Sequence, residues 1–341
     1  MRFLQIALAV MVALVVGIVA VGFYLPDRLR LQRSIVIERP PATVFTVLHG
    51  FRHFSAWSPW AELDPAMQVE LSGPVLGPGA RYAWRSESAS VGSGSQEILA
   101  SESYRSVTVG LRFGGRDTQT LARYRLEPQA DGTRVTWFYE ADFGYDLASR
   151  YVGAMIGGKL GADYERGLQR LKSHVETMPA TDFAGARIEY LEVPAQTIAY
   201  WSGRSSTDAG EIAAAYTQAY QRVADALSRD QLKPAGPVLA IGRRWDAEAD
   251  VYEFDAAVPV LPGTQLSAAA GVKIGQTYAG PVLKAAHQGP NGTLQDHLGK
   301  LMAYKRAAGY ADNGAPWDVY VSDPATTPEA ERVVETYVPV R

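Results

Sequence analysis

Ala257-Val258-Pro259-Val260 and Tyr337-Val338-Pro339-Val340 close two blocks of sequence, and the second motif stands 80 residues after the first. Each block is expected to run strand, turn, strand, helix and two further strands. A fixed period of this kind predicts two similar half-modules that bury their apolar faces against each other. Small molecules commonly bind in the cleft at the axis of such a pair, so a binding site is expected in residues 183–341.

The hydrophobic pattern assigns the elements of these blocks. Alternation of apolar and polar residues predicts strands over 187–193, 196–201, 237–243, 251–260, 317–321 and 333–340. Asp208 is the predicted N-cap of a helix over 209–229, and a second helix is expected over 293–308.

Three segments of this region carry a resemblance: His287-Gln288-Gly289-Pro290, then Pro316-Trp317-Asp318-Val319-Tyr320-Val321-Ser322-Asp323-Pro324, then Glu335 to Val340. Together they resemble the GyrI-like family, the effector-binding domain found behind helix-turn-helix modules in multidrug-responsive transcription activators. Some members are small-molecule hydrolases. The resemblance implies a cleft with aromatic walls and a buried carboxylate that receives flat cationic or polar ligands. This chain has no DNA-binding module at its N-terminus, which argues against transcriptional control.

Candidate site residues follow from the resemblance and from the repeat. The family pattern assigns Trp317 and Tyr320 to the cleft wall, with Tyr252 and Tyr278 as further candidates. Counting back equally from the two Val-Pro-Val endings pairs Asp255 with Glu335, which would face one cavity and raise each other's pKa. One of them would then serve as a general acid or base. The alternative is that both are solvated strand residues. His287 is expected to have a structural role at a turn.

The preceding region, residues 31–178, is predicted to form a separate domain. A strand is expected at 34–38, a helix at 42–54, and an antiparallel meander between 67 and 142. A long helix with one apolar stripe follows, from Tyr151 to Val175. Glycines are unfavourable inside a helix, so those in its first half indicate close approach or a kink: Gly153, Gly157, Gly158 and Gly161.

This region also carries a resemblance, through Ile35 to Phe45, Trp57-Ser58-Pro59-Trp60 and Asp131 to Trp137. These segments resemble the helix-grip fold of the START/polyketide-cyclase superfamily (SRPBCC). The resemblance implies that hydrophobic ligands lie between the sheet and the last helix, and it implies no catalytic constellation. The pocket candidates are aromatic: Trp57, Trp60, Trp84, Trp137 and Tyr139. The alternative is that these rings fill the core.

The N-terminus carries a long apolar segment. Phe3 to Leu25 contains no charged residue and one strongly polar residue, Gln5, and it is long enough to cross a bilayer. An uncleaved membrane anchor over residues 3–25 is the first interpretation, a signal peptide the second and a buried soluble helix the third. Arg28, Arg30 and Arg33 follow the segment, which favours a cytoplasmic body.

Composition excludes several classes of site. The formal net charge of −3 provides no basic surplus for binding nucleic acid. The absence of cysteine excludes disulfides, thiolate metal sites and a cysteine nucleophile. His49 and His53 stand four residues apart, but no third ligand lies nearby in the sequence, so no metal or other cofactor is expected.

The sequence therefore predicts an α+β chain with an N-terminal membrane helix (3–25), a helix-grip domain (31–178) and a duplicated β-α-β-β domain of the SHS2-type pair (183–341). The expected function is that of a membrane-anchored protein that binds or senses a hydrophobic or cationic aromatic small molecule. The alternative is a hydrolase or isomerase that acts on a reactive small molecule through Glu335 and Tyr320. A third hypothesis, by family analogy, is a module that binds a protein such as a topoisomerase.

Overall fold

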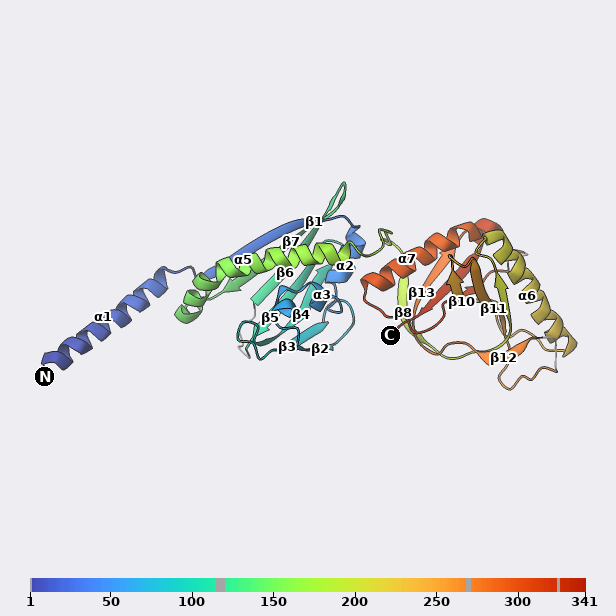
Figure 1. Cartoon of the computed structure of the whole chain (residues 1–341), viewed down its shortest axis with the longest axis horizontal. Coiled ribbons are helices and arrows are strands. Elements are labelled where there is room, and N and C mark those ends of the chain that lie inside the picture. Colours follow the sequence, from blue (N-terminus) through green and yellow to red (C-terminus); the bar gives the residue numbers. More distant parts are fainter. Residues whose placement is uncertain (1, 115–119, 268–270, 324–325) are drawn as a thin grey trace. The chain divides into compact units, whose positions relative to one another are not determined.

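The computed structural model describes residues 2–114, 120–267, 271–323 and 326–341. It is an α+β protein with one apolar N-terminal helix and two antiparallel sheets (Figure 1). The chain divides into two compact units: Met1–Ala184 with Ala307–Gly309, and Gly185–Arg306 with Tyr310–Arg341. The first strand begins at Arg28, three residues before the predicted domain start, because its alternating pattern continues toward the N-terminal helix.

The first unit contains a seven-stranded sheet in the order β1-β7-β6-β5-β4-β3-β2, with every neighbouring pair antiparallel. Its strands are β1 (Arg28–Ile37), β2 (Gln68–Ser72), β3 (Arg81–Arg85), β4 (Ser93–Glu102), β5 (Ser106–Phe113), β6 (Thr120–Gln129) and β7 (Gly132–Asp142). Its helices are α1 (Arg2–Tyr24), α2 (Pro41–Leu48), α3 (Phe54–Trp57), α4 (Pro59–Leu63) and α5 (Leu147–Val175).

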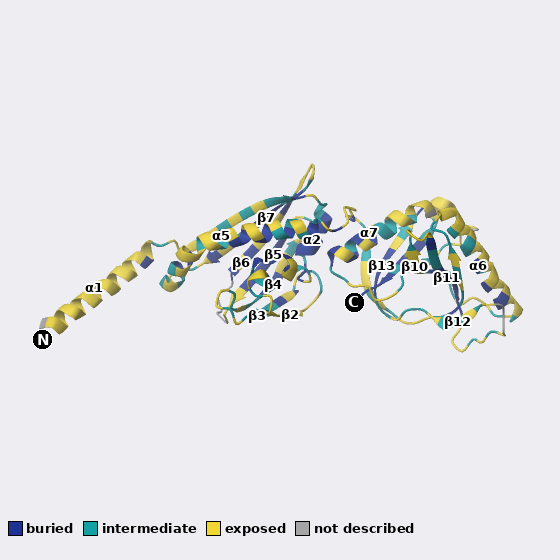
Figure 2. Ribbon diagram, viewed as in Figure 1, coloured by how far each residue is buried: buried dark blue, intermediate teal, exposed yellow. Residues whose placement is uncertain are grey.

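Helix α5 begins at Leu147, four residues before its predicted start, and buries the C-terminal half of its apolar stripe against the sheet. The Asp146 side chain accepts a hydrogen bond from the Ser149 backbone N–H and so satisfies one free donor of the first turn. Tyr164, Leu168 and Leu171 are buried under the helix. Every second residue of β7 is buried and those between are half-buried or exposed, so one face of the strand packs into the core (Figure 2).

The glycines of α5 allow close packing, as predicted for two of the four. A Cβ at Gly153 would lie 2.4 Å from a Phe143 ring carbon, and a Cβ at Gly161 would lie 2.7 Å from the Arg33 guanidinium. Neither position has room for a larger residue unless its neighbour moves. Gly158, in contrast, has nothing within 4 Å of the same point.

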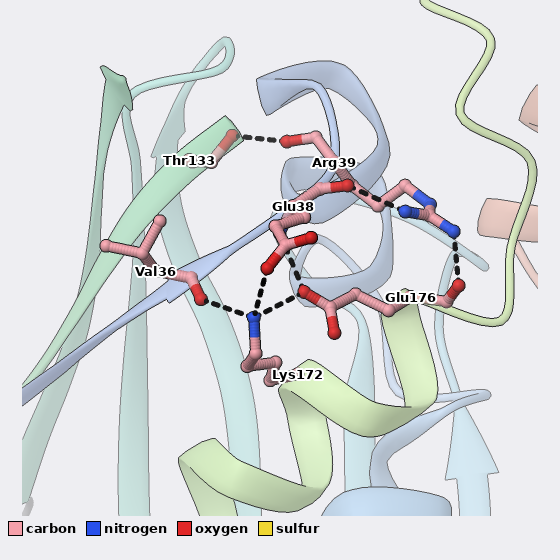
Figure 3. Close-up of polar contacts among 6 residues, drawn as sticks. All are labelled: Val36, Glu38, Arg39, Thr133, Lys172 and Glu176. Atoms are coloured by element: carbon pink, nitrogen blue, oxygen red, sulfur yellow. Dashed lines mark hydrogen bonds and ion pairs between the residues drawn. The ribbon is translucent and has the colours of Figure 1, made fainter. Parts of the chain in front are cut away.

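A group of polar contacts ties the C-terminal end of α5 to the end of β1 (Figure 3). Lys172 Nζ lies 2.6 Å from Glu176 Oε1 and 3.1 Å from the Val36 carbonyl oxygen. The Glu38 backbone N–H donates to the same Glu176 oxygen at 2.8 Å. Arg39 donates to the backbone carbonyls of Glu176 and Met178. These contacts hold the last turn of α5 on the sheet and have a structural role.

The second unit contains an eight-stranded sheet in the order β12-β9-β11-β10-β14-β15-β13-β8. Its strands are β8 (Ile188–Val193), β9 (Thr197–Ser205), β10 (Leu239–Asp246), β11 (Val251–Pro259), β12 (Lys273–Gln276), β13 (Gly280–Gln288), β14 (Trp317–Tyr320) and β15 (Val333–Pro339). Its helices are α6 (Ala209–Arg229) and α7 (Leu294–Ala307), with short 3-10 turns at Asn291–Thr293 and Glu329–Glu331. Helix α6 has the predicted bounds, and its predicted cap Asp208 accepts from the Gly210 and Glu211 N–H groups.

Strand register places both helices on the same face of this sheet. Ala256, Ala240, Asp318, Thr336 and Ala285 are successive partners across β11, β10, β14, β15 and β13, so their side chains point to one face. Ala256 belongs to the cluster under α6, whereas Ala285 packs with Leu301 of α7. This face is called the helix face below, and the other the open face.

Candidate functional site

Asp318 lies at the centre of the helix face, on strand β14 between the strands beneath α6 and those beneath α7. Its carboxylate accepts one hydrogen bond, from Thr336 Oγ1 at 2.6 Å. No Lys, Arg or His among the described residues forms an ion pair with it. Burial raises the pKa of Asp318 to about 6, while the Thr336 hydroxyl lowers it by a smaller amount. Asp318 is therefore a sheltered carboxylate without a cation.

Tyrosines from three elements surround this carboxylate. Tyr220 of α6, Tyr252 of β11 and Tyr320 of β14 are close enough that the charge of Asp318 raises the pKa of each phenol, in addition to the larger effect of burial. Their hydroxyls therefore stay protonated at neutral pH. Tyr216 joins the group from α6, with its hydroxyl 3.0 Å from that of Tyr252. This set is called the tyrosine–Asp318 cluster.

One hydroxyl of the cluster has no partner. The Tyr220 oxygen is buried and forms no hydrogen bond within the described structure. A buried hydroxyl without a partner is unfavourable by about 1–3 kcal/mol, so such groups in native proteins call for an explanation. Because the Tyr220 hydroxyl lies near Asp318, a ligand that contacts both groups would explain why this hydroxyl has no partner within the protein.

The local sequence accounts for the cluster. Alternation along β14 puts Asp318 and Tyr320 on one face and Trp317 and Val319 on the other. On α6, Tyr216 and Tyr220 stand four residues apart, the spacing that stacks side chains on one helix face. Their rings stack with centroids 5.8 Å apart. The cluster can accept a hydrogen bond or ion pair through Asp318 and present ring faces to a cation.

The two carboxylates paired by the repeat lie on the open face, each beside a cation. Asp255 is buried, with Arg243 Nη2 2.6 Å from one oxygen and Ser202 Oγ 2.7 Å from the other. Glu335 lies 2.7 Å from Lys284 Nζ, and the Tyr337 hydroxyl donates to it at 2.8 Å. Burial alone would raise the pKa of Glu335, but the Lys284 and Tyr337 hydrogen bonds lower it further, so the net change is downward.

The pKa of Glu335 is therefore lowered by its own neighbours and not raised by Asp255. Strands β10 and β14 lie between β11 and β15, and neighbouring strands are about 4.8 Å apart, so about 14 Å separates the two positions. At that distance each carboxylate responds to its own cation. The repeat relates the two residues by symmetry without bringing them together.

The aromatic residues predicted for the cleft wall divide between the two faces. Trp317 lies on the open face, where its ring stacks on that of Tyr337 with centroids 5.1 Å apart, and Tyr278 packs beside it. Tyr320 and Tyr252 lie on the helix face. One cavity cannot be lined by both sets, because the sheet separates them. The sequence prediction missed Asp318, Tyr216 and Tyr220, although the alternation at 317–320 already places Asp318 with Tyr320.

An open cavity of about 770 Å³ with a mixed polar and aromatic lining lies beside Asp255. Its lining includes Tyr200, Arg204 and Arg243. The charged groups at its centre, Arg243 and Asp255, satisfy each other, so this cavity presents no sheltered charge to a ligand.

The five aromatic residues predicted for the first pocket do not all lie together. Trp57, Trp60 and Tyr139 surround Trp137 and Tyr164, whose rings stack with centroids 3.8 Å apart. Trp84 instead contacts Phe113 and Tyr82. The indole N–H groups of Trp57 and Trp137 are buried and have no hydrogen-bond partner in the part of the chain that the structure describes.

The histidines occupy separate positions. His49 lies 2.8 Å from Ser101 Oγ, and His53 lies 3.0 Å from His174, so the two do not converge on one point. His287 lies 3.0 Å from Thr293 Oγ1 at the entry to α7, which agrees with a structural role. Among the described residues, no group of three or more His, Asp or Glu side chains is arranged to hold a metal.

Two family models match the chain. The model described as polyketide cyclase / dehydrase and lipid transport matches residues 28–176, and that described as GyrI-like small molecule binding domain matches residues 186–341. The prediction of these two families, in this order, is confirmed. No curated protein matches the chain.

Solved structures give more distant likenesses. The EcmrR C-terminal domain is 15% identical with a TM-score of 0.41, over 46% of this chain and 98% of that domain. EcmrR in a complex with DNA is 12% identical with a TM-score of 0.41, over 63% of this chain and 88% of that one. A hydrolase from Listeria innocua is 14% identical with a TM-score of 0.34, over 46% and 92%. Likenesses this distant assign no activity to this chain.

Proposed function

We propose that this chain, which joins a polyketide cyclase-like domain to a GyrI-like domain, is a membrane-anchored protein that binds small molecules without transforming them. The second domain binds a planar ligand that carries a positive charge or a hydrogen-bond donor. The observation that carries this proposal is the tyrosine–Asp318 cluster, a sheltered carboxylate with no cation partner among the described residues.

The chemistry of the cluster defines the ligand class. A carboxylate that is partly removed from water is unfavourable while it is charged and unpaired, so a ligand cation that reaches the half-buried Asp318 relieves part of that penalty. Tyrosine ring faces attract the same cation, and protonated hydroxyls such as that of Tyr220 donate to polar groups at its edge. The row that contains Asp318 otherwise carries the small residues Ala256, Ala240, Thr336 and Ala285, so the large side chains near the carboxylate are those of the tyrosines.

The first domain supports a second, more apolar site. Between its sheet and α5 lie aromatic rings and two unpartnered indole donors, those of Trp57 and Trp137. A hydrophobic ligand with one hydrogen-bond acceptor suits that interior. Trp60 and Tyr139 are the further candidates for contact, and Trp84 is the weakest because it packs elsewhere.

Two features support the architecture that we propose. Residues 188–259 and 273–339 have the same order of elements, two strands, a helix and two strands, as expected of a duplicated pair. Among the described residues, one helix is long and apolar enough to span a bilayer, and this helix is α1. Its side chains are exposed almost throughout (Figure 2). We assign it to a membrane anchor, with the body on the cytoplasmic side because Arg28, Arg30 and Arg33 follow it.

No geometry favours the enzymatic alternative through Glu335 and Tyr320. Glu335 is the register partner of Val319, so it points to the open face, whereas Tyr320 points to the helix face. The two side chains cannot act on one ligand across the sheet. Glu335 is also paired with Lys284, which keeps it charged and occupied.

A comparison of the two carboxylates tests the proposal. The probes are N-methylacridinium, a permanent cation, and neutral acridine, each titrated into the full chain at pH 8 by calorimetry. Asp318→Asn should weaken N-methylacridinium binding by about 10- to 100-fold, because a charged interaction of about 1.5–3 kcal/mol is lost, and should leave acridine binding nearly unchanged. Glu335→Gln, the matched variant on the open face, should change neither. Loss of cation binding in Glu335→Gln but not in Asp318→Asn would assign the ligand to the open face and refute the proposed site.

A further inference from the structure

The C-terminal end of α1 is joined to the start of α5 by a buried arginine. Arg150, which is 8% exposed, donates through Nη1 to the carbonyl oxygens of Gly22, Phe23 and Leu25 at 3.2–3.4 Å. Its other nitrogens donate to the Gly144 carbonyl. The last carbonyl groups of a helix lack hydrogen-bond partners within the helix, and they form the negative end of the helix dipole. A guanidinium provides both the missing donors and a compensating positive charge. The anchor helix therefore ends on α5.

A tyrosine extends this joint along α1. The Tyr151 hydroxyl donates to the Ile18 carbonyl at 2.6 Å, and a Cβ at Gly22 would lie 3.2 Å from the Tyr151 ring. Ile18 lies six residues before the last residue of α1, which corresponds to about 9 Å along the helix axis. The whole of α1 is about 35 Å long, only slightly more than the roughly 30 Å hydrocarbon core. A bilayer that α1 spans therefore reaches the level of Tyr151.

Large apolar side chains next to this joint are exposed. Met155 lies one turn beyond Tyr151 on the same stripe of α5 and is 82% exposed. Tyr145, in the turn before α5, is 89% exposed, and Val152 and Ile156 are exposed beside them. These residues are called the α5 apolar patch. Lys159 follows the patch one turn later and is exposed.

We propose that the α5 apolar patch is a second membrane contact, which lies in the interface of the bilayer that α1 spans. Three features of the patch favour lipid over a protein partner. It adjoins the exposed apolar side chains of α1 through Tyr151, which contacts Ile18 and Val21 of that helix. The polar groups at the joint are satisfied internally, as hydrocarbon requires. The α5 apolar patch also has Tyr145 at one end and Lys159 at the other, and both residue types commonly lie at the level of the lipid headgroups. This inference rests on the proposed anchor.

The chain contains no cysteine, so single-cysteine labelling tests the proposal cleanly. Met155→Cys and Tyr145→Cys, each in the full chain in phosphatidylcholine/phosphatidylglycerol vesicles, are labelled with the fluorophore NBD. Val15→Cys in α1 is the control for a bilayer position. Leu71→Cys is the control for an exposed apolar position on β2, at the opposite edge of the sheet from β1. All four side chains are exposed, so substitution should not disturb packing.

Each label is quenched by doxyl-labelled lipid and, separately, by aqueous iodide. We expect lipid quenching at Met155 and Tyr145 comparable to that at Val15, and at least 3-fold weaker iodide quenching than at Leu71. Iodide quenching at Met155 equal to that at Leu71, with Val15 lipid-quenched, would overturn the patch and leave the anchor intact. Protection at Met155 from both quenchers would also overturn it, since a protein surface or a second copy would then cover the patch. Iodide quenching at Val15 would refute the anchor itself.

Discussion

Asp318 is a half-buried carboxylate on a central strand of the second sheet, and burial raises its pKa. Thr336 donates a hydrogen bond to it, three tyrosines lie close enough to feel its charge, and no described cation pairs with it. Asp255 and Glu335, the other carboxylates considered for the site, both sit beside a cation. The contrast shows why a carboxylate count cannot identify a binding site. The missing partner, and not the carboxylate itself, distinguishes Asp318.

The raised pKa of Asp318 predicts that this residue destabilises the second domain at neutral pH. The ordinary pKa of Asp is about 3.9 and that of folded Asp318 is about 6, so between these values the folded state binds more protons than the unfolded state. The free energy of unfolding therefore falls as the pH rises from about 4 to about 6. Asp318→Asn removes this effect and should stabilise the domain by about 1–3 kcal/mol at pH 8, with little change at pH 4.

Hydrogen exchange of peptides from β14 and β15 measures this difference, because wild type and variant are compared at the same pH. Protection should be higher in Asp318→Asn at pH 8 and similar in the two proteins at pH 4. Reduced protection in the variant at both pH values would mean that the Thr336 hydrogen bond outweighs the buried charge. Cation binding by the wild type should also weaken below pH 6, as Asp318 becomes neutral.

At the scale of elements, α5 serves three structures at once. Its first turns hold the end of α1, its middle packs on the aromatic rings above β7, and its last turn is fixed to β1 by Lys172 and Glu176. Glycines in its first half accommodate neighbours that approach closely, which offsets their low helix propensity. The predicted kink is not needed to explain Gly153 and Gly161, because close approach accounts for both.

Two alanine substitutions in α5 should therefore have opposite effects. Gly158→Ala adds a methyl group where nothing lies within 4 Å and should raise the free energy of unfolding by up to about 1 kcal/mol. Gly153→Ala places the methyl group against the Phe143 ring and should lower it by about 1–3 kcal/mol. Urea unfolding of the full chain in detergent, followed by tryptophan fluorescence, gives both values. A stabilised Gly153→Ala would mean that Phe143 moves aside without loss of packing.

At the scale of the whole molecule, each of the two units has its own sheet and its own buried core. Trp137, Tyr164 and Leu168 centre the first, and Ala199, Phe254 and Leu283 belong to the clusters of the second. The first matched family region ends at residue 176 and the second begins at residue 186, so a short segment separates the two. Phe183, within that segment, is buried.

Separate expression tests whether these units are independent domains. Fragments 26–184 and 185–341 should each be soluble and unfold in one cooperative transition, because the first starts before β1 and keeps Phe183. The shorter fragment 31–178, which follows the sequence-based boundaries, should be less stable, since it lacks the first three residues of β1. Circular dichroism during thermal unfolding measures each transition. Insolubility of both longer fragments would indicate a shared core.

Local rules were sufficient to predict most of the fold. Alternation and helical periodicity act between residues a few positions apart, so β7, α5 and the exact-length helix α6 with its Asp208 cap could be read from the sequence. The two families were recognised for the same reason, because their motifs are short and contiguous. The apolar segment at the N-terminus needs only composition and length.

The site depended on strand pairing, which connects residues far apart in the chain. Alternation shows that Asp318 and Tyr320 share a face, but it does not show which face carries the helices. That is decided when Asp318 pairs with Thr336 and Ala240, since this register sets Asp318 beneath α6 and α7 and turns Glu335 away. A shift of one residue would reverse every side chain. Tertiary structure therefore selected Asp318, because only long-range pairing determines which carboxylate is sheltered without a cation partner.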